Sequence, residues 1–71
     1  MRDVEIRGDM IRLGQLLKLA DVVGSGGEAK ALLAELPVTV NGGPEARRGR
    51  QLHHDDVVDV DGEQLRVVAR G

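Results

Sequence analysis

Cysteine is absent from this 71-residue sequence, and so are the three aromatic residue types Phe, Tyr and Trp. Without cysteine, the chain has no disulfide framework, no thiol nucleophile and no cysteine-ligated zinc or iron–sulfur site. Without aromatic rings, it has no platform of the kind on which many RNA-binding domains stack bases. Disulfide scaffolds and aromatic base-stacking readers are therefore excluded.

Long apolar runs are also missing, because no stretch approaches the roughly 20 apolar residues that a membrane-spanning helix requires. Charged and apolar residues alternate over residues 1–6, which is unlike a signal peptide. We therefore expect a cytoplasmic protein with no membrane partner.

The sequence is rich in aliphatic side chains: 41% of its residues are hydrophobic, and all of these are Leu, Val, Ile, Ala or Met. The length supports one domain over residues 1–71 and leaves no room for a second core. A chain of this size buries only about 60% of the surface that it exposes when unfolded, so we expect modest stability.

Two periodicities follow one another near the N-terminus. Apolar and charged residues alternate over residues 3–7, which predicts a short strand with one buried face. From Met10 to Ala20, apolar residues recur at helical spacing, which predicts an amphipathic helix, and Asp9 is its expected N-cap. Gly14 lies inside this helix, where it costs about 1 kcal/mol relative to Ala, so we expect another element to approach closely there.

A second amphipathic helix is predicted after a glycine-rich break at residues 24–27. Ser25 followed three residues later by Glu28 is a capping-box signature, and Pro37 ends the apolar periodicity. Two amphipathic helices joined by a short glycine-rich turn are expected to pack against each other.

The rest of the chain has the pattern of a small sheet. A strand is predicted at residues 38–40 and a turn at residues 41–42. An irregular loop follows over residues 42–56, with a short extended piece near Leu52. Residues 57–68 predict a hairpin with a two-residue Asp-Gly turn. The expected fold is α+β, with two packed helices on a small, mostly antiparallel sheet in the order β-α-α-β-β-β.

The net charge of −2 conceals an uneven distribution. Residues 1–11 sum to −1, residues 12–50 to +2 and residues 51–71 to −3. Three basic residues form a cluster, Arg47, Arg48 and Arg50, and three more lie in the predicted helices, Arg12, Lys18 and Lys30. The basic part predicts either a surface for a polyanion or an ordinary solvated face, and the acidic hairpin would limit non-specific adhesion.

Five segments carry a family resemblance by their order and spacing: RLGQLLK at 12–18, SGGEAKALL at 25–33, VTVNG at 38–42, RRGR at 47–50 and DVV at 56–58. Together they resemble the S4-type RNA-binding domain, and more narrowly the small stand-alone bacterial proteins of the YbcJ-like group. The resemblance covers about residues 4–68. It implies the alphaL motif, a helix pair on a small sheet, and a surface that binds structured RNA.

From this resemblance we expect an RNA partner such as rRNA or a tRNA-like fold, and a role in the ribosome or in RNA metabolism. We expect no cofactor and no small-molecule substrate, and a monomer. Two positions depart from the family pattern. Gly26 stands where the family has an arginine after the helix-start Ser, so the arginine cluster would have to replace one phosphate contact. Asp55 and Asp56 stand where the family has Gly-Asp, so a tight turn must form without glycine.

The candidate RNA-binding surface combines the N-terminus of the second helix with the loop at residues 47–50. Unpaired amides at a helix start, the Ser25 hydroxyl and the positive end of the helix dipole all suit phosphate oxygens. Arginine forks suit bidentate phosphate contacts, and recognition by shape and backbone fits a chain without aromatics. Asn41 is a candidate contact, although the favoured role for it is to accept positive φ before Gly42. The full candidate set is Arg12, Lys18, Ser25, Gly26, Gly27, Lys30, Asn41, Arg47, Arg48 and Arg50.

Other functions have less support. Residues 53–56, His-His-Asp-Asp, have metal-ligand chemistry, but adjacent side chains in an extended segment point opposite ways, and we predict no metal site. Residues 24–27 resemble a phosphate loop only in composition, and no catalytic constellation surrounds Ser25, so we do not expect an enzyme. A β-grasp sulfur carrier would need a hairpin before the first helix. A protein–protein adaptor remains the rival interpretation.

Overall fold

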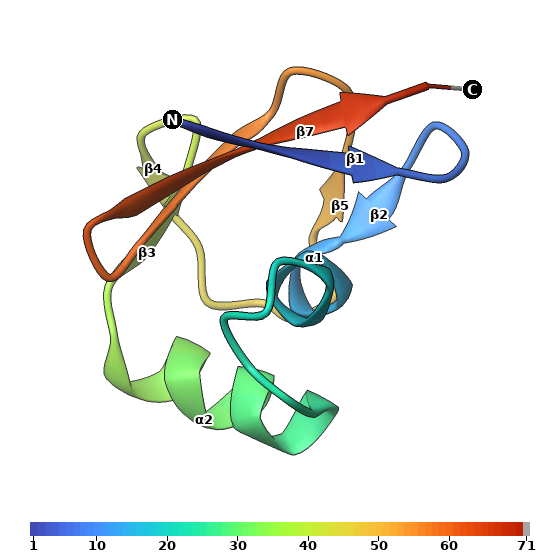
Figure 1. Cartoon of the computed structure of the whole chain (residues 1–71). Coiled ribbons are helices and arrows are strands. Elements are labelled where there is room, and N and C mark those ends of the chain that lie inside the picture. The colour runs from blue at the N-terminus through green and yellow to red at the C-terminus, as the bar shows by residue number, and fades with distance from the viewer. Residues whose placement is uncertain (71) are drawn as a thin grey trace.

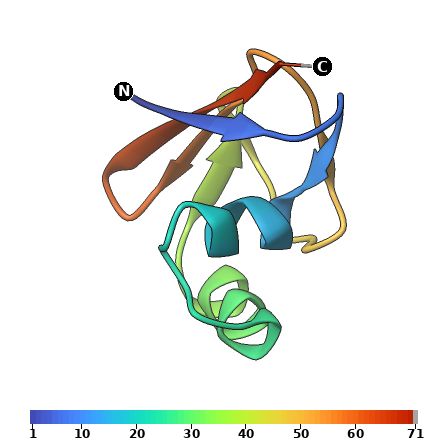
Figure 2. The same ribbon diagram turned by 45° about the vertical axis from the view of Figure 1, so that its right-hand side comes forward.

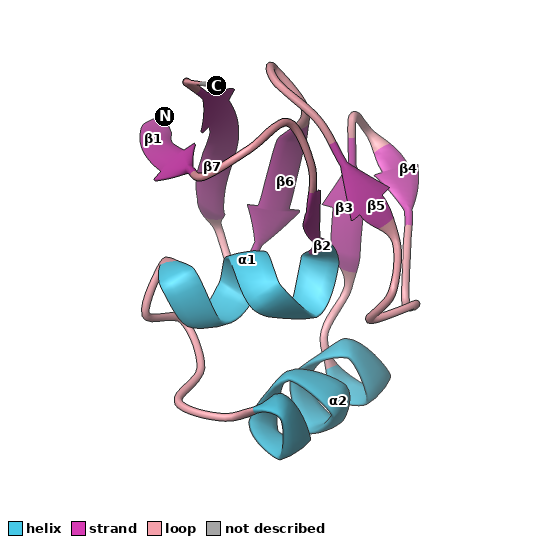
Figure 3. Ribbon diagram, turned by 90° about the vertical axis from the view of Figure 1, so that its right-hand side faces the viewer, coloured by secondary structure: helices cyan, strands magenta, loops and turns pink. Residues whose placement is uncertain are grey.

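The computed structural model describes residues 1–70 and arranges them as a sheet covered on one side by two helices (Figure 1). In chain order the elements are β1 (Arg2–Ile6), β2 (Ile11–Arg12), α1 (Leu13–Leu19), α2 (Gly26–Glu35), β3 (Val38–Val40), β4 (Gly43–Pro44), β5 (Gln51–Leu52), β6 (Val57–Val60) and β7 (Glu63–Ala69). Figures 2 and 3 show α1 lying between the sheet and α2. The predicted α+β class is confirmed.

The main sheet has five strands in the order β1-β7-β6-β3-β4. Its neighbouring strands are antiparallel except for β1 and β7, which run parallel with Val4 opposite Val67. The predicted hairpin is confirmed as β6 and β7. A separate antiparallel pair joins β2 to β5, and β5 is the short extended piece expected near Leu52.

The core is aliphatic and centres on α1. Leu13, Leu16 and Leu17 of α1 are fully buried, and they share one hydrophobic core with the fully buried Val58 of β6 and Leu65 of β7. The outer helix α2 buries only two side chains, Ala29 and Leu33. The expected packing of the two helices against each other is confirmed.

The start of α1 differs from the expectation. Asp9 is not the N-cap, because the helix begins at Leu13 with Arg12 in the cap position. The preceding residues pair with β5 as strand β2. The first helical amides then donate to carbonyls of the loop at residues 47–50: Leu13 N–H to Arg50 O and Gly14 N–H to Arg48 O, both at 2.9 Å. Backbone carbonyls thus replace the side-chain cap that local sequence predicts.

The start of α2 follows the prediction. Ser25 is the N-cap, and its Oγ accepts a hydrogen bond from Glu28 N–H at 3.2 Å. The Glu28 carboxylate in turn accepts from Gly24 N–H at 3.0 Å. None of the helices in the described part of the chain has the length and apolar character that crossing a bilayer requires.

Four turns in the described chain hold a non-glycine residue at positive φ, and one of these residues is Asp21, with φ 65°, after α1. Asn41 has φ 52° before Gly42, and Asp61 has φ 50° before Gly62, as expected for these turns. Asp55 has φ 73°, so the turn before β6 does form without glycine. The amide of Asp55 donates to Val67 O at 2.8 Å, which ties this turn to β7. The departure from the family pattern therefore leaves the fold intact.

Candidate nucleic-acid interface

A hollow of about 400 Å³ lies where α1, the start of α2 and the loop at residues 47–50 meet. We call it the cationic hollow, because its lining contains three basic side chains and no acidic one. The residues that line it are Arg12, Gly14, Gln15, Lys18, Gly26, Arg48 and Gly49. Four of these residues belong to the candidate set, and a fifth, Gly14, is the position where a close approach was predicted. The structure therefore gathers residues that are far apart in the sequence.

Arg48 runs across α1 towards the start of α2, and Gly14 makes room for it. A Cβ placed on Gly14 would lie 2.8 Å from Arg48 Cγ, closer than two carbon atoms can approach without displacement. This confirms the close approach expected at Gly14. A Cβ placed on Gly26 would lie 4.0 Å from Arg48 Nη1. The guanidinium of Arg48 therefore lies beside the position where the family pattern has its own arginine.

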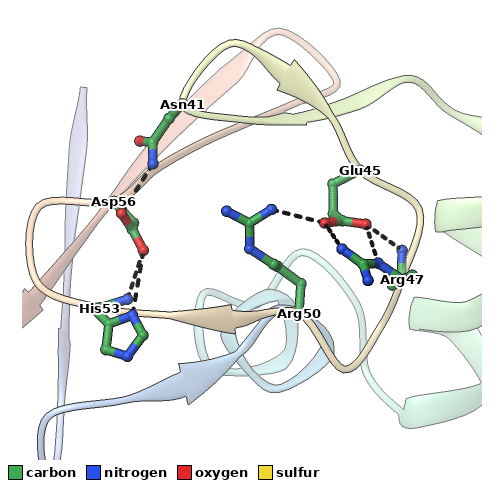
Figure 4. Close-up of polar contacts among 6 residues, drawn as sticks. All are labelled: Asn41, Glu45, Arg47, Arg50, His53 and Asp56. Atoms are coloured by element: carbon green, nitrogen blue, oxygen red, sulfur yellow. Dashed lines mark hydrogen bonds and ion pairs between the residues drawn. The ribbon is translucent and has the colours of Figure 1, made fainter.

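The other two arginines of the cluster are held by Glu45 (Figure 4). Arg47 contacts the Glu45 carboxylate through Nε at 3.0 Å and Nη2 at 3.1 Å, and Arg50 through Nη1 at 2.9 Å. The Glu45 side chain is only 6% exposed. Hydrogen bonds from Arg47, then from Arg50, lower the pKa of Glu45 from its ordinary value of 4.5 to about 2.

The arginine cluster thus divides into two kinds of residue. Arg47 and Arg50 share one buried carboxylate, which offsets part of their charge and orders the loop. Arg47 nevertheless keeps 78% of its side chain exposed, so its outer edge remains accessible. Within residues 1–70, four candidate cations form no ion pair: Arg12, Lys18, Lys30 and Arg48. Arg12, Lys18 and Arg48 line the cationic hollow, whereas Lys30 lies outside its lining on the exposed side of α2.

The start of α2 offers fewer unpaired hydrogen-bonding groups than its sequence suggests. The Ser25 oxygen caps the amide of Glu28, and the carboxylate of Glu28 holds the amide of Gly24. The amides of Gly26 and Gly27 lie in the first turn of α2, so they have no helical carbonyl one turn earlier to accept from them. Of these, Gly26 lines the cationic hollow.

Asn41 lies apart from the cationic hollow and is engaged in the fold (Figure 4). Its Nδ2 donates to Asp56 Oδ1 at 3.0 Å, and its Oδ1 accepts from Val57 N–H at 2.9 Å. Burial raises the pKa of Asp56, but hydrogen bonds from Asn41 and from the His53 amide outweigh it, so the pKa lies below its ordinary value. The turn role favoured for Asn41 matches this geometry.

The histidine pair also has structural contacts. His53 N–H donates to Asp56 Oδ2 at 2.7 Å, and His54 Nδ1 accepts from Ala69 N–H at 3.0 Å. Over residues 1–70, no group of three or more His, Asp or Glu side chains is arranged to hold a metal ion.

Three residues of the site were missed in the sequence. Glu45 organises the arginine cluster, and its spacing of two and five residues before Arg47 and Arg50 is the signal that could have shown it. Gln15 and Gly49 line the cationic hollow. Gln15 stands one helical turn after Arg12, which was a detectable pattern, but nothing in the local sequence marked Gly49 beyond its place among the arginines.

Two packed helices on a mostly antiparallel sheet, with basic side chains gathered where the helices meet the 47–50 loop, define the class of the S4 domain. The family model described as S4 domain matches residues 4–68, and the chain belongs to that family. The chain is also similar to the probable ribosome maturation protein RlbA of Bacillus subtilis (strain 168), with 54% identity over 59 residues, which is 83% of each chain.

Proposed function

We propose that this protein is a non-enzymatic RNA-binding module that acts in ribosome maturation and holds structured ribosomal RNA by its phosphates and shape. Membership of the S4 family and the similarity to a probable ribosome maturation protein support an RNA-related and ribosome-related role. The observation that carries the proposal is the cationic hollow, where three cations without acidic partners in the described chain face one concave surface.

In this proposal Arg48 is the main phosphate ligand. Its guanidinium presents a planar fork and lies beside the free amides at the start of α2, so one phosphate group can contact both. Arg12 and Lys18 line the same hollow along α1 and contact the neighbouring phosphates of the same RNA strand. Gly26 and Gly49 carry no side chain, so the RNA backbone can approach the protein backbone closely.

The remaining candidate residues have secondary roles. The exposed edge of Arg47 reaches a neighbouring phosphate, while Arg50 keeps the loop in place through Glu45. Lys30 adds a point charge at the margin of the surface. Ser25 and Asn41 act mainly through the protein contacts that they already make. The module is expected to bind as a monomer in the cytoplasm, where ribosomes are assembled.

The proposal is tested with two triple variants that change the net charge by the same amount, from −2 to −5. Arg12→Gln/Lys18→Gln/Arg48→Gln removes the cations of the cationic hollow. Arg2→Gln/Arg66→Gln/Arg70→Gln removes three cations that pair with acids on the sheet. We expect the first variant to bind purified bacterial ribosomal RNA at least ~10-fold more weakly in filter binding, because it loses phosphate contacts.

The second variant should bind within about twofold of wild type, since its cations are already paired on an exposed surface. Circular dichroism checks that both variants are folded. Equal losses of affinity in the two variants would show that only net charge matters, and unchanged affinity in the first would contradict the cationic hollow as the binding site. Binding that does not depend on salt would favour the protein–protein adaptor.

A further inference from the structure

We propose that a second, apolar hollow beside the cationic hollow holds an unstacked base of the bound RNA, an inference that rests on the proposed function. This apolar hollow measures about 570 Å³, within the range of about 300–1,000 Å³ typical of small-molecule sites. It lies between the end of β1, β2 and the outer face of α1. Its lining residues are Glu5, Ile6, Arg7, Met10, Ile11, Gln15, Lys18 and Leu19.

The two hollows adjoin each other along α1. Gln15 and Lys18 line both of them. Arg12, Gln15 and Leu19 follow one another at helical spacing on one face, so the polar end of that face borders the cationic hollow and its apolar end borders the second.

The floor of the second hollow is apolar and uncovered. Leu19 is 53% exposed, although the rest of its helix buries its leucines completely. Met10 and Ile11 are partly buried beside it, and Ile6 closes the base of the hollow. Aliphatic and thioether groups can cover the flat face of a base, so a chain without aromatic residues still offers one surface for base contact.

The charge around the rim favours a nucleotide over an apolar protein segment. Glu5 is the one acidic lining residue, and its carboxylate pairs with Arg70 at 3.2 Å. Arg7 and Lys18 form no ion pair within the described residues, so the rim has an excess of positive charge. Gln15 Oε1 accepts from Arg12 N–H at 3.2 Å, which leaves its NH₂ group to donate to the edge of a base.

The test uses two RNA hairpins with the same stem, one fully paired and one with a single unpaired 2-aminopurine in the stem. An unpaired base costs least to flip out, and 2-aminopurine fluorescence rises when the base leaves the stack. We expect wild type to bind the bulged hairpin about fivefold more tightly, which corresponds to the partial burial of one leucine-sized apolar surface, and to raise its fluorescence.

Leu19→Ala should abolish both the preference and the fluorescence rise without changing affinity for the paired hairpin. Leu36→Ala is the matched control, because Leu36 is the exposed leucine at the far end of α2 and should retain both signals. Arg48→Gln should weaken both hairpins equally. If Leu19→Ala behaves as wild type while Arg48→Gln weakens both hairpins, the base site is wrong, the proposed function stands, and a protein side chain becomes the occupant to test. Failure of wild type to bind either hairpin would contradict the proposed function itself.

Discussion

Glu45 is the residue on which the order of the arginine cluster depends. Its carboxylate receives three side-chain hydrogen bonds from Arg47 and Arg50 and a fourth from the Arg47 amide at 3.1 Å. Its own amide donates to Val38 O at 2.9 Å, so the acid is anchored to β3. A buried carboxylate is stable only when it is paired and hydrogen-bonded, and here both conditions are met.

Acid should weaken the fold through Glu45. The folded pKa is about 2 and the ordinary value is 4.5, so on acidification the unfolded chain takes up this proton before the folded chain does. The stabilisation is complete above pH 4.5 and is lost as the pH falls towards 2. We expect Glu45→Gln to be less stable than wild type at neutral pH and to lose stability less steeply between pH 4.5 and 2, measured by urea unfolding.

Glu35→Gln is the control for this experiment, because Glu35 is exposed at the end of α2 and forms no ion pair in the described chain. Glu35→Gln should lose stability as steeply as wild type between pH 4.5 and 2. Some acid sensitivity should persist in Glu45→Gln, since a hydrogen bond from Arg66 lowers the pKa of Asp3 and the contacts of Asp56 lower its pKa. If wild type and Glu45→Gln lose stability equally steeply as the pH falls, the role given to Glu45 is contradicted.

At the scale of elements, α1 and the 47–50 loop form one unit. The loop carbonyls of Arg48 and Arg50 accept the first amides of α1, and the side chain of Arg48 lies over Gly14. The local sequence could show a helix and an exceptional glycine within it. It could not show the helix start, because the two residues before α1 pair with β5, which lies about 40 residues later in the chain.

The Gly14–Arg48 contact predicts that Gly14→Ala changes stability in opposite directions when Arg48 is present and when it is replaced by Ala. Alanine is about 1 kcal/mol better than glycine inside a helix, but its Cβ at position 14 would meet Arg48 Cγ at 2.8 Å. We expect Gly14→Ala to destabilise wild type and to stabilise an Arg48→Ala background. The difference between the two backgrounds should be at least about 1 kcal/mol in urea unfolding.

Gly26→Ala is the matched control for that cycle. Its Cβ would meet nothing closer than the mobile end of Arg48 at 4.0 Å, so its effect on stability should be the same in both backgrounds. An effect of Gly14→Ala that is equal in both backgrounds would contradict the close packing of Arg48 on α1.

At the scale of the whole molecule, the sheet and the helices carry their charge differently. The cations of the sheet pair with acids, as Arg2 does with Glu63 and Arg66 with Asp3. The cations around the cationic hollow do not. A protein with a net charge of −2 can therefore present a local positive surface, as the uneven charge along the sequence predicts.

The sequence predicted the order of the main elements, the aliphatic core and the hairpin, because each of these depends on local periodicity and turn residues. It did not predict that β1 lies parallel to β7, since alternation over residues 3–7 shows a buried face but not a partner. For the candidate site, the sequence predicted six basic residues, of which Arg12, Lys18 and Arg48 line one hollow. The spacing of Glu45 from Arg47 and Arg50 indicated that these two could be paired, but the burial of Glu45 and its anchoring to Val38 depend on the fold.

The central claim, that unpaired cations of the cationic hollow contact RNA phosphates, is tested most directly by the salt dependence of ribosomal RNA binding. The log–log slope of affinity against salt should be roughly −0.7 to −0.9 for each phosphate contacted. Replacing Arg12, Lys18 and Arg48 by Gln should make the slope shallower by about 2 to 3 units, one contact for each cation. The same slope in wild type and in this variant would contradict the account.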